Sequence, residues 1–174
     1  MTIICLHSAC KSKTAEPVTK INIFDFQSFF NAEIAVLNNN HVALIKTIID
    51  RENVYSNDEK NPNWNSELLA FKTFAYIKPQ QRDQYDVDTL KSENGLTFIT
   101  YSANNEQLHL QLAEVMYNQN NTIEKITLVV KSKSKISNND MTLTYLPQKG
   151  YDIKGDVNSS VAGNHLIDIH VSCN

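Results

Sequence analysis

Residues 143–153 have the sequence Leu-Thr-Tyr-Leu-Pro-Gln-Lys-Gly-Tyr-Asp-Ile. Their pattern predicts two strands of a sheet and the turn between them. Leu143 and Tyr145 alternate with threonines, which is the period of two expected of a half-buried strand. Residues 147–150 supply the proline and glycine of a turn, and residues 151–157 favour a second strand. Parallel strands need a helical crossover between them, and this connection is too short to hold one. The segment therefore predicts an antiparallel hairpin.

The same alternation continues on both sides of this hairpin, from Gly95 to the end of the chain. Polar segments at 104–106, 118–121 and 137–140 divide it and predict turns. All of these connections are short, so the second half of the chain predicts an antiparallel meander. The alternating apolar residues are Leu96, Phe98, Leu108, Leu110, Leu112, Ile126, Leu128, Val130, Met141, Ile167, Ile169 and Val171.

The first half has a helical period instead. After Asp25, a plausible N-cap, apolar residues recur at spacings of three, four or seven up to residue 49, and the three asparagines at 38–40 either kink this helix or split it in two. Asn61-Pro62 predicts a second helix start, Pro79 its end, and residues 52–60 the loop between. The apolar residues on these stripes are Phe26, Phe30, Ile34, Leu37, Leu44, Ile48, Trp64, Leu68, Phe71 and Ala75.

Helices followed by strands are typical of an α+β domain, so we expect N-terminal helices packed on one face of a curved antiparallel β-meander. With 41% apolar residues, residues 21–174 can form a single domain with one core. In the order of its elements the chain resembles the cystatin-like and nuclear-transport-factor-like folds. Residues 143–155 also resemble part of small exported bacterial lipoproteins of unknown function.

The N-terminus carries an apolar run followed by Ser8, Ala9 and Cys10, and these three residues match the last three positions of a bacterial lipoprotein export signal. His7 departs from that pattern, and so does the short apolar region, which an upstream start would lengthen. The resemblance implies that residues 1–9 are the remnant of an export signal, that Cys10 carries a lipid, and that residues 10–20 form the lipid anchor and a flexible tether. The protein would then lie in the bacterial cell envelope, facing the periplasm or exposed on the surface.

The cysteines leave a second possibility open. If the signal is cleaved before Cys10, Cys5 is lost and Cys173 remains as a lone thiol. In an oxidising compartment Cys10 and Cys173 could instead form a disulfide, which a lipid on Cys10 would prevent.

Motifs for chemistry are absent from the sequence. The net charge of -3 is spread over both signs, so nucleic acid is not an expected partner. No pattern for a cofactor or a catalytic nucleophile occurs, and we expect neither a catalytic residue nor a cofactor. The nearest approach to a metal site is His165, Asp168 and His170, which we interpret as a solvated strand face. Asp86 and Asp88 form the closest carboxylate pair, in what their polar flanks predict to be a loop.

The aromatic residues of the predicted helices are most simply core residues. Some could instead line a cleft between helices and sheet, and Phe30, His41, Trp64 and Phe71 are the candidates. The leading hypothesis is a non-enzymatic envelope lipoprotein, held to a membrane by its lipid, that binds a protein or a glycan. The alternative is a carrier or sensor of a small hydrophobic ligand in that cleft; an enzyme whose site leaves no sequence motif is the third possibility.

Overall fold

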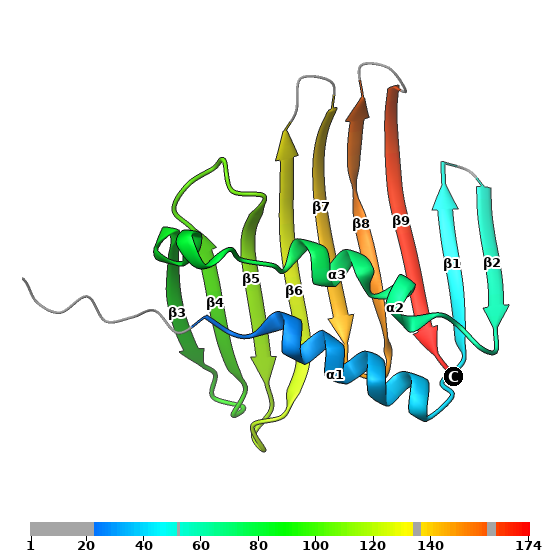
Figure 1. Cartoon of the computed structure of the whole chain (residues 1–174), viewed down its shortest axis with the longest axis horizontal. Coiled ribbons are helices and arrows are strands. Elements are labelled where there is room, and N and C mark those ends of the chain that lie inside the picture. The colour runs from blue at the N-terminus through cyan, green and yellow to red at the C-terminus, as the bar shows by residue number, and fades with distance from the viewer. Residues whose placement is uncertain (1–22, 52, 134–136, 160–162) are drawn as a thin grey trace, which may run out of the picture.

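The chain forms an open antiparallel sheet of nine strands, to which a few helices are added (Figure 1). The computed structural model describes residues 23–51, 53–133, 137–159 and 163–174. The strand order is β2-β1-β9-β8-β7-β6-β5-β4-β3, so β2 and β3 form its two edges. The predicted signal, anchor and tether, residues 1–20 with Cys10, lie outside the described residues.

Seven consecutive strands form an antiparallel meander, and six of them, β4 to β9, lie in the part of the chain after Gly95 where the alternation predicts it. They pair with their neighbours in chain order, always antiparallel, which confirms that part of the prediction. Residues 137–140, which we expected to form a turn, belong to a strand instead. The strands are β3 (Tyr85–Lys91), β4 (Thr97–Ala103), β5 (Leu110–Tyr117), β6 (Ile123–Lys133), β7 (Ser137–Leu146), β8 (Gly150–Ser159) and β9 (Gly163–Cys173).

The segment after the three asparagines differs most from the predicted structure. It is not helical but forms β1 (Leu44–Asp50), and the expected loop forms β2 (Asn53–Glu59). Four of the seven residues of β1 are isoleucine or threonine, whose branched Cβ favours a strand over a helix. Strand β1 pairs with β9, the last strand of the chain, so this hairpin extends the meander at its far end.

Strand β3 is the second correction. Asp86 and Asp88 lie in this strand rather than in a polar loop. Both are exposed, because β3 is an edge strand whose side chains meet solvent on most of its length. Charged side chains on an edge strand hinder its pairing with other chains. Strand β3 is therefore rich in polar residues, as a loop would be.

Helix α1 (Phe26–Asn39) begins where the sequence predicts. The side chain of Asp25 accepts a hydrogen bond from the amide of Ser28 at 3.0 Å, and the helix ends among the asparagines. The predicted second helix is broken into α2 (Trp64–Glu67) and α3 (Leu69–Phe74), and its cap is Asn63 rather than Asn61. Pro79 does not end that helix; it begins a 3-10 helix, η1 (Pro79–Gln84).

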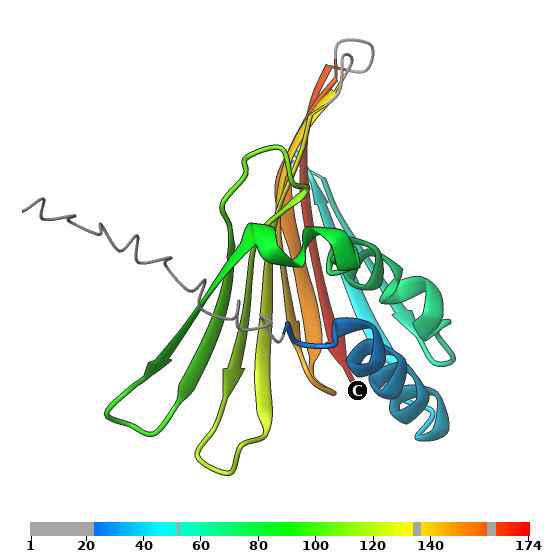
Figure 2. The same ribbon diagram turned by 60° about the vertical axis from the view of Figure 1, so that its left-hand side comes forward.

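Aromatic rings join the helices to the middle of the sheet. Tyr145 of β7 lies directly opposite Tyr151 of β8, and both are buried. Phe30 of α1 contacts Tyr145 at a centroid distance of 5.4 Å, while Phe71 of α3 contacts Tyr145 at 5.7 Å and Tyr151 at 5.4 Å. In Figures 1 and 2 helices α1 and α3 run across the direction of the strands, which lets each helix reach several of them.

Candidate functional site

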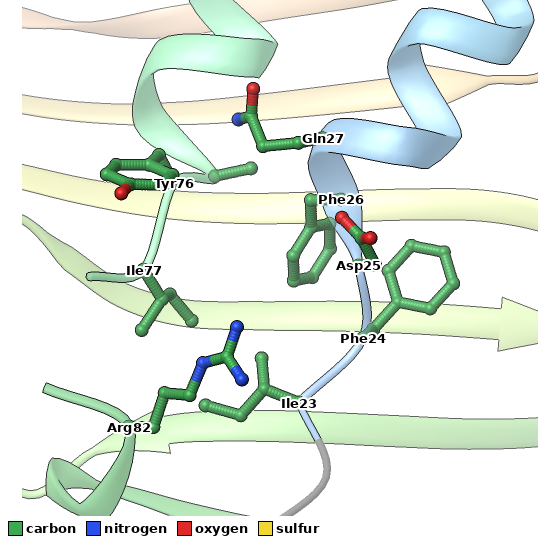
Figure 3. A pocket seen from close by; sticks show the side chains of 9 residues that line it. Ile23, Phe24, Asp25, Phe26, Gln27, Tyr76, Ile77 and Arg82 are labelled. Carbon is green, nitrogen blue, oxygen red and sulfur yellow. The ribbon is translucent and has the colours of Figure 1, made fainter. Parts of the chain in front are cut away.

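A hollow of about 310 Å³ lies beside the start of α1, where the segment between α3 and η1 passes close to it (Figure 3). The N-terminal turn of α1 lines one side, and Tyr76, Ile77 and Arg82 line the other. Ile23, Phe26 and Ile77 are buried and give it an apolar floor. Its volume falls at the lower end of the roughly 300–1,000 Å³ typical of ligand pockets.

The charges at the rim come from Arg82 and Asp25. In Figure 3 the guanidinium group of Arg82 extends into the space between Ile23 and Ile77. The hydroxyl and the amide of Ser28 both donate hydrogen bonds to Asp25, and these bonds, together with the nearby charge of Arg82, lower the pKa of the Asp25 carboxyl. Both rim groups are therefore charged at neutral pH, one of each sign.

Two further side chains add uncharged polar groups to the rim. The side-chain amide of Gln27 donates to the carbonyl oxygen of Lys72, at 2.5 Å, which holds the amide in place and leaves its own oxygen as an acceptor. Tyr76, which also lines the hollow, is 46% exposed. The hollow thus combines a half-exposed tyrosine, an amide and two opposite charges around an apolar floor.

Two pairs of tyrosine and glutamate, one buried and one partly buried, lie elsewhere and link helices to the sheet. Tyr145 donates to Glu33 of α1 at 2.7 Å, and Tyr151 donates to Glu67 of α2 at 2.5 Å. Lys46 of β1 forms an ion pair with Glu67 at 2.6 Å. Burial, and then the adjacent carboxylate, raises the pKa of each tyrosine, so both phenols stay protonated and serve as donors.

These pairs link the helices to the sheet. A buried carboxylate without a donor is costly, so each tyrosine stabilises the position of the helix that carries its partner. Glu33 is not among the residues predicted from the sequence, although the sequence contains a signal for it. It is a carboxylate on the apolar stripe of a helix, between Phe30 and Leu37, where a buried partner is required.

Cys173 lies near this region with a partly buried thiol. Burial, and to a lesser extent the charge of Glu33, raises its pKa to about 11. The thiol is therefore protonated at neutral pH and a poor nucleophile. Cys10, its possible disulfide partner, lies outside the described residues.

The four residues proposed to line a cleft fall into two groups. Phe30, Trp64 and Phe71 are at most 1% exposed and belong to the core, where Phe30 and Phe71 contact each other at 5.6 Å. Trp64 also donates to the carbonyl oxygen of Val42 at 3.0 Å. His41 is exposed at the end of α1, and it shares with Trp64 only a small hollow of about 90 Å³.

The candidate metal ligands near the C-terminus have other partners. His170 contacts Asp152 at 2.7 Å, and Asp168 lies 3.7 Å from Lys154. Within the part of the chain that the structure describes, no three histidine, cysteine or acidic side chains converge on one point where an ion could sit.

Helices long and apolar enough to cross a membrane do not occur among the described residues. Comparison with known proteins adds no relative: no protein-family model, no curated protein and no solved structure matches this chain.

Proposed function

We propose that this protein is a non-enzymatic binding domain of the bacterial cell envelope, and that the hollow beside α1 binds a glycan. The observation that carries this proposal is the combination of Tyr76, Arg82 and Gln27 around an apolar floor. A sugar ring presents hydroxyl groups at its edge and C–H groups on its faces. Planar polar side chains can bond the former, and an exposed aromatic ring can pack against the latter.

The size and opening of the hollow favour one end of a glycan over a whole chain. About 310 Å³ is small for a pocket, so we propose that a terminal sugar enters and that the remainder extends into solvent. Arg82 further favours a sugar that carries a carboxylate, since a guanidinium binds carboxylates through two parallel hydrogen bonds.

The alternative, a small hydrophobic ligand between helices and sheet, has less support. It relies on the finer arrangement that the sequence predicts, with the helices covering one face of a curved sheet in the general plan of cystatin-like or nuclear-transport-factor-like folds. The ring contacts from α1 and α3 to Tyr145 support that arrangement. Phe30 and Phe71, however, already occupy the space in which such a ligand would have to lie.

Binding at the hollow can be tested on an array of bacterial and host glycans. We expect the full chain to bind one class of acidic glycan, and we expect Tyr76→Ala and Arg82→Gln each to weaken that binding by about tenfold or more, the cost of one lost stacking or charged contact. Lys78→Gln serves as the matched control, because Lys78 is exposed close by but does not line the hollow. An array on which the unaltered chain binds nothing would end the glycan proposal.

The lipid anchor is a separate part of the proposal and rests on Ser8, Ala9 and Cys10 alone. We propose that the lipid on Cys10 holds the domain to a membrane, facing the periplasm or the outside of the cell. The intact mass of the exported protein should equal that of residues 10–174 plus acyl chains, and Cys10→Ala should abolish both cleavage and acylation. A mass without acyl chains and two hydrogens short would indicate the Cys10–Cys173 disulfide instead.

A further inference from the structure

Two opposite charges line the hollow beside α1 without pairing with each other. Asp25 lies at the start of α1 and Arg82 in η1, on the other side of the hollow. Hydrogen bonds from Ser28, and to a smaller extent the charge of Arg82, lower the pKa of the Asp25 carboxyl. The ion pairs among the described residues nevertheless include none between Asp25 and Arg82. Both charges therefore remain available to a ligand that enters the hollow.

The carboxylate of Asp25 accepts hydrogen bonds from uncharged groups only, within the described part of the chain. The amide of Ser28 donates to it at 3.0 Å and the hydroxyl of Ser28 at 2.7 Å, and the backbone amide of Gln27 is a third donor. All three donors belong to the first turn of α1 and hold the carboxylate in one position. A carboxylate has about four acceptor positions, so one of them is left for a ligand.

Gln27 adds a second acceptor from the same turn of α1. Its side-chain nitrogen donates to the carbonyl oxygen of Lys72, which leaves its side-chain oxygen to accept. In Figure 3 Asp25 and Gln27 extend from α1, while Arg82 reaches the hollow from η1. An ammonium group has three donors and suits two such acceptors, whereas a carboxylate placed there would be repelled by Asp25. The side of α1 therefore favours a cation, and the side of η1 favours an anion.

We infer that the glycan end bound in the hollow carries an unacylated amine as well as a carboxylate, an inference that rests on the proposed glycan function. The carboxylate binds the guanidinium group of Arg82 through two parallel hydrogen bonds, and the ammonium group binds Asp25 and Gln27. A hollow of about 310 Å³ is small for a pocket, so both groups are those of the terminal sugar. Acetylation of the amine removes its charge and two of its three donors, so it weakens the binding.

Isothermal titration calorimetry of the full chain at about pH 6, where a primary amine is an ammonium group, tests this inference. Muramic acid carries a carboxylate and a free amine, and N-acetylmuramic acid differs from it only in the acetylated amine. We expect muramic acid to bind about fivefold more tightly, the effect of one additional exposed ion pair. Alanine carries the same two charged groups without a sugar, and we expect it to bind more weakly than muramic acid.

Asp25→Asn tests the assignment of the ammonium group to Asp25. Asparagine caps a helix about as well as aspartate, so this variant keeps the cap of α1 and loses the charge. The preference for muramic acid over N-acetylmuramic acid should fall from about fivefold to about one. Asp83→Asn is the matched control and should keep the preference, because Asp83 is exposed in η1 but does not line the hollow. Circular dichroism of both variants checks that the helices are intact.

The results separate a failure of this inference from a failure of the proposed function. Equal affinities for the two sugars, or a preference that Asp25→Asn does not change, would overturn the inference and leave the glycan proposal standing. A chain that binds other acidic glycans of the array but not muramic acid would do the same. A chain that binds no glycan, or that binds alanine as tightly as muramic acid, would overturn the glycan proposal and the inference with it.

Discussion

Replacing Phe30 by alanine is expected to lower the free energy of unfolding by about 3–5 kcal/mol. The ring is fully buried between α1 and the sheet, with Phe29 at 5.2 Å, Phe71 at 5.6 Å and Tyr145 at 5.4 Å between ring centroids. Its removal leaves a cavity that these neighbours cannot close, because their own positions are fixed by further contacts. The loss therefore includes both the burial of the ring and the cost of the cavity.

Urea denaturation followed by circular dichroism measures this loss. Leu69→Ala is the control, because Leu69 lies on a helix but is 58% exposed, and its replacement should change stability by no more than about 0.5 kcal/mol. Equal, small effects of the two replacements would show that Phe30 lines an accessible cleft instead of the core. That result would revive a hydrophobic ligand as the proposed function.

The part of the fold that the sequence predicts well is the part with one buried face. In β6 and β7, Ile126, Leu128, Leu143 and Tyr145 are buried while the threonines between them are not, so the alternation in the sequence reflects the structure directly. Helix α1 is predictable for a similar reason, since its stripe from Phe26 to Leu37 faces the core and Asp25 caps it.

Edge strands cannot be predicted from alternating apolar residues in this way. Strand β2 is exposed on both faces over most of its length, so no alternation marks it, and its polar residues are those of a loop. Strand β1 fails for another reason. Leu44 and Ile48 continue the spacing of α1 by coincidence, and only the branched residues of this segment indicate a strand.

The candidate site depends on contacts between distant parts of the chain, which a single sequence does not contain. Asp25 and Arg82 come together because the start of α1 and the 3-10 helix η1 line the same hollow. Likewise, nothing near Glu33 in the sequence points to Tyr145, its hydrogen-bond partner. Residues of a binding hollow need no local motif, and none marks this one.

Gly150→Ala is expected to lower the free energy of unfolding by about 2–6 kcal/mol. Gly150 begins β8 with φ at +136°, where a residue with a Cβ atom is strained by about 1–3 kcal/mol. A Cβ here would lie 1.9 Å from the carbonyl oxygen of Val171 in β9, and moving that backbone adds roughly another 1–3 kcal/mol. The amide of Cys173 bonds to the carbonyl oxygen of Lys149, so the strands cannot separate here without losing that bond.

Gly163→Ala separates the two causes. Gly163 also has a positive φ, +77°, but no atom lies within 4 Å of the position that a Cβ would take, so only the backbone strain of about 1–2 kcal/mol remains. Thermal unfolding of both variants should therefore give a clearly larger loss for Gly150→Ala. Equal losses would mean that β8 and β9 do not approach so closely at Gly150.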